Sequence, residues 1–420
     1  MLLKKTCVSA WLCALFAMTA SQFAMTASQA AETKWVASWA SSPLEGKIVI
    51  PGIPPEKIPP SPILRGTVRY RLPLNQGGAR LMLRITNEAN RTPLTVGAVT
   101  VAIADAGLTA RSATIRTVTF GGRSSVTLPG GTPALSDPVD LSTKSADAVI
   151  VSIFLPNDTE CPLGQRGIQA VTLDGRDATQ MPTLEGAAPT IGRTLVSAIL
   201  VASGPDAKTI VALGDSITDG AVTDTPDVRG WPGHLALRLM RSRAQVHFAV
   251  ANEGIGGNRV LSDVIGLSAL ARFDRDVSSL PNVTHVILLE GINDIGFSRL
   301  PDNTNPGPPI EAGTLIGAYR QIIGRAHLRG IKVVGGTLGP FQGAMYYSEA
   351  GEHIRQSVND WIRSGGEFDA VVDFDRALRD PGEPHKLAAV YDSGDHLHPS
   401  DAGYKAMADA IELSMFSGSK

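Results

Sequence analysis

The first half of the chain, from residue 34 to about residue 202, consists of short runs in which apolar and polar side chains alternate. In the clearest run, Leu81, Leu83 and Ile85 fall on one face of an extended segment, and two arginines and a methionine fall on the other. Glycine, proline, asparagine and aspartate separate the runs, which is typical of turns between antiparallel strands. The pattern predicts an antiparallel, β-sandwich-like domain whose clearest strands are residues 67–72, 79–85, 94–103, 112–120 and 148–155.

The pattern changes after Pro205. Nearly continuous apolar runs follow one another, and the segments between them carry apolar side chains at helical spacing, as in residues 315–326. Strands that are apolar on both faces and alternate with helices are typical of a parallel sheet covered on both sides. The second half is therefore predicted to be an α/β domain whose strands are residues 209–213, 246–250, 285–289, 331–334 and 370–374.

The first 30 residues differ from the rest of the chain. Lys4 and Lys5 precede an apolar stretch at residues 11–20, and small residues around Ala30 resemble a signal-peptidase site. The stretch is shorter than the roughly 18–20 residues that span a bilayer, so a cleaved leader is favoured over stable membrane insertion. We therefore expect a secreted or periplasmic protein with a signal peptide at residues 1–30, a β-rich accessory domain at 31–204 and the α/β domain at 205–420.

Charge and cysteine content exclude several kinds of partner and site. The formal net charge is −2 and no basic run is present, so the sequence predicts no nucleic-acid binding. Cys7 and Cys13 lie in the predicted leader, which leaves Cys161 without an internal disulfide partner and without a thiolate zinc cage. Cys161 is expected to be a partly buried thiol. Nothing in the sequence indicates an oligomeric state.

Polar segments follow the first three predicted strands of the α/β domain. They are residues 214–220, 252–258 and 290–294, and a fourth polar segment, residues 395–400, precedes the last predicted helix. Functional groups converge at the carboxyl ends of the strands in an open parallel sheet. We therefore expect the first three segments to share one site.

These segments contain every group that acyl transfer needs: a nucleophile, a base, a group that orients the base, and donors for the oxyanion. Ser216 is the candidate nucleophile, His398 the base that takes its proton, and Asp395 the carboxylate that holds the imidazole in the required tautomer. The candidate oxyanion donors are the amides of Ser216 and Gly257 and the side chain of Asn293. The predicted chemistry is ester hydrolysis through an acyl-enzyme.

The same segments resemble the SGNH, or GDSL-type, hydrolase family. The resemblance rests on Gly-Asp-Ser at 214–216, Gly257, Gly-Ile-Asn-Asp at 291–294 and Asp-His-Leu-His at 395–398, in the family's order. It implies a three-layer α/β/α fold for residues 205–420, the triad named above, and no metal or organic cofactor. One position departs from the family: Gly256 stands where many relatives carry serine, so Gly254 or Gly256 is an alternative source of the amide.

The first half resembles a secreted bacterial branch of this family more loosely. The matching segments are residues 35–43, 67–69 and 136–138, together with residues 229–232 of the second half. This branch is typified by carbohydrate acetylesterases and arylesterases, so the resemblance implies short acyl groups, acetyl above all, on plant polysaccharides. The alternatives are a lipase, arylesterase or thioesterase acting on longer or aromatic esters, and a catalytically silent carbohydrate-binding protein.

Several polar and aromatic residues have more than one interpretation. Asp395, His396 and His398 are possible metal ligands, but no second cluster supplies the remaining ligands, and His396 is expected to pack beside the cleft. His285, in an apolar run, is expected to be structural. The sequence leaves open whether Trp231 lines the acyl pocket or the interface between the domains. Two aspartates either bind sugar hydroxyls or cap helices, and capping is favoured: Asp219 and Asp294.

Overall fold

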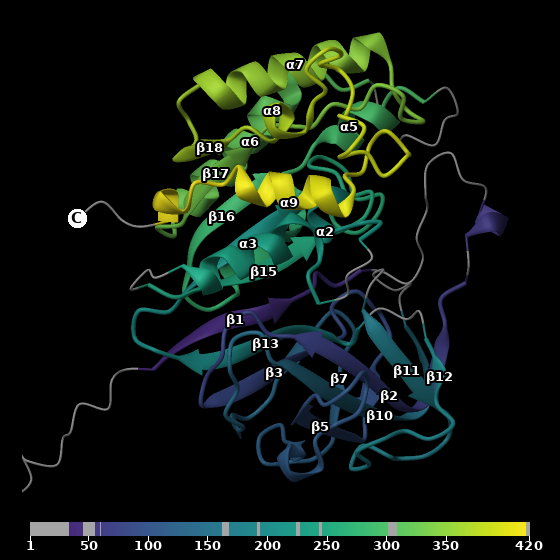
Figure 1. Cartoon of the computed structure of the whole chain (residues 1–420). Helices are drawn as coiled ribbons and strands as arrows, with labels where there is room; N and C mark the ends of the chain where they lie inside the picture. The colour runs from purple at the N-terminus through teal and green to yellow at the C-terminus, as the bar shows by residue number, and fades with distance from the viewer. Residues whose placement is uncertain are drawn as a thin grey trace, which may run out of the picture.

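The computed structural model describes residues 33–44, 55–58, 60–161, 168–190, 194–223, 227–242, 246–300 and 309–416. The predicted signal peptide at residues 1–30 lies outside the described residues. Figure 1 shows a β-rich half, drawn in purple and blue, below an α/β half drawn in green and yellow. Among the described residues, no helix combines the length and the apolar character that crossing a bilayer would require.

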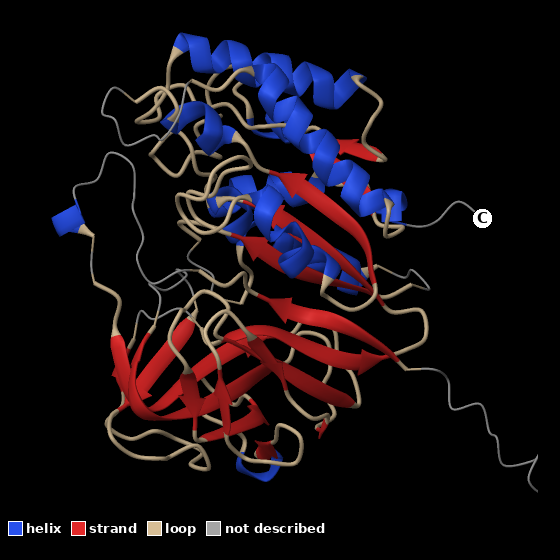
Figure 2. Ribbon diagram, turned by 180° about the vertical axis from the view of Figure 1, so that it is seen from behind, coloured by secondary structure: helices blue, strands red, loops and turns tan. Residues whose placement is uncertain are grey.

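The β-rich half is built from antiparallel strands, as the alternating pattern predicts. Figure 2 shows the strands of this half as two layers without helices between them. One sheet has the order β1-β13-β3-β8, with β9 also paired to β3; the bounds are Lys34–Ala40, Val196–Ser203, Arg80–Thr86, Pro133–Leu135 and Val139–Asp140. The other has the order β12-β11-β2-β10-β5-β6, with bounds Ala188–Pro189, Gln169–Leu173, Ile63–Pro73, Ala148–Glu160, Ala98–Ile103 and Arg116–Val118.

The alternation within β3 decides which face of its sheet is buried in the sandwich. Leu81, Leu83 and Ile85 are fully buried in the core between the two sheets. Met82, on the opposite face, packs against the core of the α/β half. Both faces of this sheet are therefore covered, one by the second sheet and the other by the α/β half.

Two of the predicted strands are wrong in extent. Residues 94–103 form two strands, β4 (Leu94–Val96) and β5, which lie in different sheets, and β4 pairs with β7 (Val126–Leu128). The break falls at Gly97, where an added Cβ would lie 2.7 Å from the ring of Phe154. Residues 112–120 begin with a 3-10 turn, η2 (Ser112–Thr114), and only the following segment forms β6. A 3-10 turn, η1 (Pro55–Lys57), precedes β2.

The α/β half contains the predicted parallel sheet, with strand order β15-β14-β16-β17-β18. In that order, the strands are Phe248–Gly254, Lys208–Gly214, Val283–Leu289, Lys332–Gly336 and Ala370–Val372. β15 continues four residues beyond the apolar run at 246–250 that predicted it. The helical elements are α2 (Ser216–Asp219), α3 (Gly230–Arg241), α4 (Ala269–Phe273), the π-helix η3 (Asp274–Ser278), α5 (Ile292–Phe297), α6 (Ala312–His327), α7 (Glu349–Ser364), α8 (Phe374–Leu378), α9 (Asp401–Asp409) and the 3-10 turn η4 (Leu413–Phe416).

Helices cover both faces of this sheet. α3 packs against α9 in front of the strands in Figure 1, whereas α6 contacts both α4 and α7. Right-handed crossovers in the observed strand order place α4, α6 and α7 on the face opposite α3 and α9. The second half therefore has the three-layer α/β/α arrangement that the family resemblance implies.

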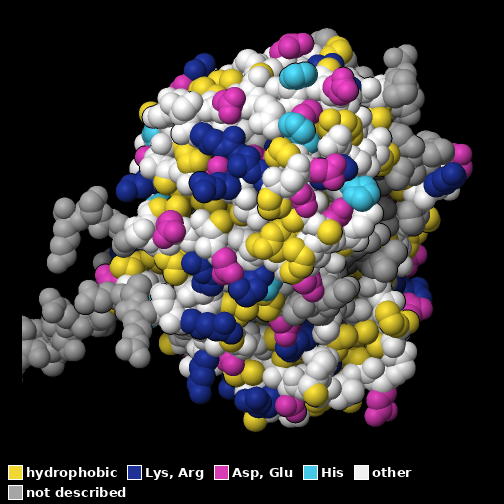
Figure 3. Space-filling view, turned by 45° about the horizontal axis from the view of Figure 1, so that its top comes forward, with side chains coloured by type: hydrophobic (Ala, Val, Ile, Leu, Met, Phe, Trp, Pro, Cys, Tyr) yellow, Lys and Arg dark blue, Asp and Glu magenta, His cyan; other side chains and the backbone are white. Residues whose placement is uncertain are grey.

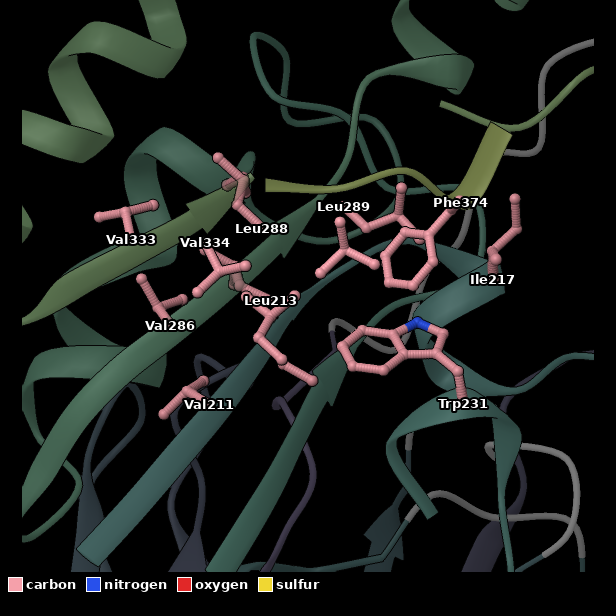
Figure 4. Close-up of a cluster of buried hydrophobic side chains, with 14 of the residues drawn as sticks. Val211, Leu213, Ile217, Trp231, Val286, Leu288, Leu289, Val333, Val334 and Phe374 are labelled. Atoms are coloured by element: carbon pink, nitrogen blue, oxygen red, sulfur yellow. The ribbon is translucent and has the colours of Figure 1, made fainter. Parts of the chain in front are cut away.

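Trp231 belongs to the core of the α/β half and lines neither of the two places that the sequence left open. Its side chain is fully buried, and its ring centroid lies 5.6 Å from that of Phe374. The indole Nε1 donates a hydrogen bond to Thr218 Oγ1 at 3.3 Å. Figure 4 shows the ring next to that of Phe374 and beside the apolar side chains of the strands. Trp231 thus packs α3 against the strand-to-helix turn that carries residue 216.

The two halves meet through an apolar surface and a few specific hydrogen bonds. Every residue of β13 is buried, and Ala198 and Leu200 on its outer face join the core of the α/β half. At the edge of the parallel sheet, the side-chain amide of Asn75 accepts from the Val250 amide at 3.1 Å and donates to its carbonyl at 2.6 Å. Asn75 therefore occupies hydrogen-bonding positions that a further strand would otherwise fill.

Candidate active site

Ser216 lies in the turn that joins the first strand of the parallel sheet to a short helix. β14 ends at Gly214, α2 begins at Ser216, and the Asp215 carboxylate caps the helix by accepting from the Ile217 amide at 2.8 Å. Gly214 has no room for a side chain, because a Cβ there would lie 2.2 Å from Thr218 Oγ1. The turn therefore holds the Ser216 hydroxyl at the carboxyl edge of the sheet, at the start of α2.

The structure brings Ser216, His398 and Asp395 into one hydrogen-bonded chain. His398 Nε2 lies 2.8 Å from Ser216 Oγ, and His398 Nδ1 lies 2.5 Å from Asp395 Oδ2. Asp395 Oδ1 accepts from the backbone amides of Leu397 and His398 at 3.0 and 2.8 Å. Partial burial opposes ionisation of Asp395, but the hydrogen bonds from the His398 ring and backbone lower its pKa below the ordinary value. The carboxylate is therefore ionised at neutral pH.

His396 forms a second imidazole–carboxylate pair that does not reach the serine. Its Nδ1 lies 2.6 Å from Asp392 Oδ2, and its backbone has a left-handed φ of 64°. The side chain is 54% exposed, whereas that of His398 is 19% exposed. His396 packs on Gly343, where an added Cβ would lie 2.9 Å from the ring. Among the described residues, no group of three or more possible ligands is arranged to hold a metal ion.

Two of the three predicted oxyanion donors, Gly257 and Asn293, lie on segments that follow β15 and β16, the strands on either side of β14. Gly257 has a φ of 73°, and a Cβ on it would lie 2.4 Å from Ile265 Cδ1, so both the backbone and the space require glycine. At Gly256 an added Cβ meets nothing within 4 Å, so the residue at that position is not fixed by packing. Asn293 Nδ2 donates to the Asn258 carbonyl at 3.0 Å, which leaves its second amide hydrogen for another acceptor.

A buried arginine that the sequence analysis did not single out joins the ends of the two strands beneath the serine. Arg272 is fully buried and donates to the carbonyls of Gly214 at 2.9 Å and Glu253 at 2.6 Å. It also donates to Asn258 Oδ1 at 3.0 Å and to Asp276 Oδ2 at 3.0 Å. The sequence signal for this network is the i,i+4 spacing of Arg272 and Asp276, which places an opposite pair on one helical face.

Buried carboxyl groups surround this arginine. Glu290 Oε2 lies 3.6 Å from Arg272, and burial raises the pKa of Glu290 well above its ordinary value. Burial also raises the pKa of Asp215 to about 7, against the opposing hydrogen bond from the Ile217 amide. Two carboxyl groups behind the nucleophile, Glu290 and Asp215, therefore ionise reluctantly, because burial disfavours their charged forms.

Neither Asp219 nor Asp294 caps a helix as predicted. Asp294 accepts hydrogen bonds from the amides of Val260 and Leu261 at 2.8 and 3.1 Å, so it anchors the loop that follows Gly257. Asp219 is the last residue of α2, and its carboxylate lies 3.6 Å from an arginine at the start of α3, Arg229. Both carboxylates hold the loops around the site in place.

Comparisons with known proteins place the second half among hydrolases. A family model described as "GDSL-like Lipase/Acylhydrolase family" matches residues 212–406. No curated protein sequence matches the chain. A GDSL-like lipase from Bacteroides thetaiotaomicron is similar at 21% identity, over 50% of this chain and 88% of that chain, with a TM-score of 0.38.

Two further solved structures are similar to the same extent. An acetylxylan esterase from Geobacillus stearothermophilus has 18% identity, over 50% of this chain and 95% of that chain, with a TM-score of 0.39. A member of the lipolytic protein G-D-S-L family from Veillonella parvula has 19% identity, over 50% of this chain and 98% of that chain, with a TM-score of 0.35. At these TM-scores, the fold assignment rests on the strand order and on the family match.

Proposed function

Because residues 212–406 belong to the GDSL-like lipase/acylhydrolase family, we propose that this chain is a serine esterase that removes short acyl groups, acetyl above all, from carbohydrate esters. The observation that carries the proposal is the chain of two short hydrogen bonds from Ser216 Oγ to His398 and from His398 to Asp395. Such a chain activates a serine hydroxyl as a nucleophile.

The reaction follows from the positions of these atoms. Ser216 Oγ attacks the ester carbonyl carbon while its proton passes to His398 Nε2, and Asp395 stabilises the imidazolium that forms. The carbonyl oxygen becomes negatively charged, and the amides of Ser216 and Gly257 and the side-chain amide of Asn293 stabilise it by donating hydrogen bonds. His398 then gives the proton to the departing alcohol. A water molecule, activated by the same imidazole, releases the acid and restores Ser216.

The main cavity between the two halves lies away from the proposed triad. A cavity of about 170 Å³ lies between the two halves, and its lining includes Trp39, Arg71 and Val250 but none of the three proposed triad residues. A long acyl chain requires an extended apolar groove that opens at the nucleophile. Since Ser216 is not among the residues that line it, the cavity between the halves is not such a groove.

An uncharged ester of a carbohydrate is also consistent with the surface charge. On the face drawn in Figure 3, basic and acidic side chains are interspersed, without a uniformly basic area that would attract a polyanion. The formal net charge of −2 agrees with this mixed surface. Export of the protein remains a prediction from residues 1–30, and N-terminal sequencing of protein recovered outside the cytoplasm tests it.

The experiment is hydrolysis of p-nitrophenyl esters from acetyl to long acyl, together with acetate release from acetylated xylan, by the chain and its Ser216→Ala variant. We expect the highest kcat/KM for the acetyl ester and loss of turnover in Ser216→Ala. A maximum at long acyl chains would indicate a lipase instead. Turnover that persists in Ser216→Ala, or binding of xylan without turnover, would refute the serine-esterase proposal.

A further inference from the structure

We propose that Tyr346 is a positioning residue of the oxyanion hole, whose hydroxyl holds the Asn293 amide in the orientation that points an N–H at the reacting carbonyl oxygen. The proposal rests on the proposed serine-esterase function. Tyr346 OH donates a hydrogen bond to Asn293 Oδ1 at 3.1 Å. The two residues lie 53 positions apart, and no sequence pattern predicts their contact.

Two partners on opposite ends of the Asn293 amide fix its plane. Its Nδ2 donates to the Asn258 carbonyl at 3.0 Å, which determines that nitrogen and not oxygen lies on that side. One hydrogen bond alone leaves the amide free to turn about its side-chain bonds, which for a terminal amide have a broad torsional minimum. The hydrogen bond from Tyr346 at the other end removes that freedom. The second hydrogen on Nδ2 then has a defined direction.

Tyr346 also affects the donor strength of this amide. A hydrogen bond donated to an amide oxygen polarises the amide, and such chains strengthen one another by roughly 10–30% per bond. Burial raises the pKa of Tyr346 well above its ordinary value, so the phenol stays protonated and remains a donor. Loss of the hydroxyl would leave a buried acceptor, Asn293 Oδ1, without this partner.

The ring of Tyr346 is held rigidly against the helix that carries Asn293. It is 4% exposed, and its centroid lies 5.0 Å from that of Phe297 in an edge-to-face arrangement. Gly296, one turn after Asn293 on α5, makes room for it, since a Cβ there would lie 2.3 Å from the ring. The hydroxyl therefore cannot move relative to the amide without displacing α5.

Another buried tyrosine provides a matched control. Tyr404 is fully buried, and its hydroxyl donates to the backbone carbonyl of Ala221 at 2.8 Å. Replacement of either tyrosine by phenylalanine removes one buried hydroxyl and keeps the ring packing. The two variants differ in that only Tyr346→Phe removes a contact with a proposed oxyanion donor.

The test measures kcat and KM for p-nitrophenyl acetate in Tyr346→Phe, Tyr404→Phe, Asn293→Ala and the double variant of Tyr346 and Asn293. We expect kcat to fall about tenfold in Tyr346→Phe with KM unchanged, as part of the ~10²–10³ that one oxyanion donor supplies. Tyr404→Phe should stay within about twofold. In the Asn293→Ala background, Tyr346→Phe should have less than a twofold further effect, because the group it positions is absent.

Three outcomes overturn the proposal. An unchanged kcat in Tyr346→Phe does so directly, and equal fold-losses in the wild-type and Asn293→Ala backgrounds mean that Tyr346 acts on something else. A fall in kcat that is matched by Tyr404→Phe and by a lowered melting temperature indicates general destabilisation. Wild-type rates in both Ser216→Ala and Asn293→Ala would instead refute the serine-esterase function itself, and the role of Tyr346 would fall with it.

Discussion

Replacement of Asp395 by asparagine should keep the active site in place and reverse the hydrogen-bonding roles of the His398 ring. Asp395 Oδ1 accepts from the backbone amides of Leu397 and His398. The oxygen of an asparagine must stay on that side, because its NH₂ group would otherwise face two donors. The NH₂ group therefore faces His398 Nδ1, which becomes the acceptor. The ring proton then moves to Nε2, the atom that has to take the proton of Ser216.

The expected loss in kcat is about 10⁴-fold, as for the same exchange in a serine-protease triad. At 1.36 kcal/mol for each factor of ten, this loss corresponds to about 5 kcal/mol of transition-state stabilisation. KM should change little, because Asp395 is separated from the ester by His398. The assay is steady-state hydrolysis of p-nitrophenyl acetate at a pH above neutrality, with a thermal melt to confirm that the variant is folded.

The chain contains a matched control for this experiment. Asp392 holds His396 through the same kind of contacts: its Oδ1 accepts from the amides of Gly394 and His396, and its Oδ2 lies 2.6 Å from His396 Nδ1. Asp392→Asn should therefore reverse the tautomer of His396 and leave kcat within a few-fold. If Asp395→Asn keeps more than a tenth of the activity, or if Asp392→Asn is equally impaired, the assignment of Asp395 and His398 is refuted.

The other predictions concern a glycine, a buried histidine, the single described cysteine and the absence of a metal requirement. Gly257→Ala should lower kcat at least tenfold, since its Cβ displaces Ile265 and its φ is left-handed, whereas Gly256→Ala should stay near wild type; equal effects would contradict the donor assignment. Burial lowers the pKa of His285 to about 4, so the unfolded chain binds an extra proton between about pH 6.5 and 4. Unfolding free energy should therefore fall by about 3 kcal/mol across this window, and denaturant titrations should show a flatter profile for His285→Leu. Burial raises the pKa of Cys161 to about 12, so a thiol reagent should label it at pH 8 only after unfolding. Chelators should leave the hydrolysis rate unchanged. A rate that a chelator lowers and added zinc restores would instead indicate a metal requirement.

The apolar periodicity predicted the elements that are long and buried on a defined face. β3 and the strands of the parallel sheet follow their patterns because each strand must bury the same side chains whatever its neighbours are. The split at residues 94–103 was not predictable, since the deciding contact is between Gly97 and Phe154, which lie 57 positions apart. The environment of Trp231 was likewise decided by tertiary packing against Phe374.

The candidate site also contains residues that local sequence patterns predict and residues that only tertiary contacts reveal. Ser216, Gly257, Asn293, Asp395 and His398 could be predicted because each occurs in a short local motif at the end of an element. The groups that support them, among them Arg272 and Tyr346, are joined to the site by contacts between distant segments. Their side chains have ordinary sequence surroundings, so only the folded chain shows which carbonyl or amide each one contacts.

The covering of β13 on both faces has a consequence for synthesis of the protein. Residues 34 to 203 leave the ribosome before β15, which packs on the outer side of β1, has been made. Until about residue 254 has emerged, the outer apolar surface of the β1-β13-β3 sheet has nothing to cover it, and at roughly 5–20 residues per second this interval lasts several seconds. We therefore expect the nascent first half to expose this face until the α/β half is made, and expression of either half alone to leave an apolar sheet face or a sheet edge uncovered.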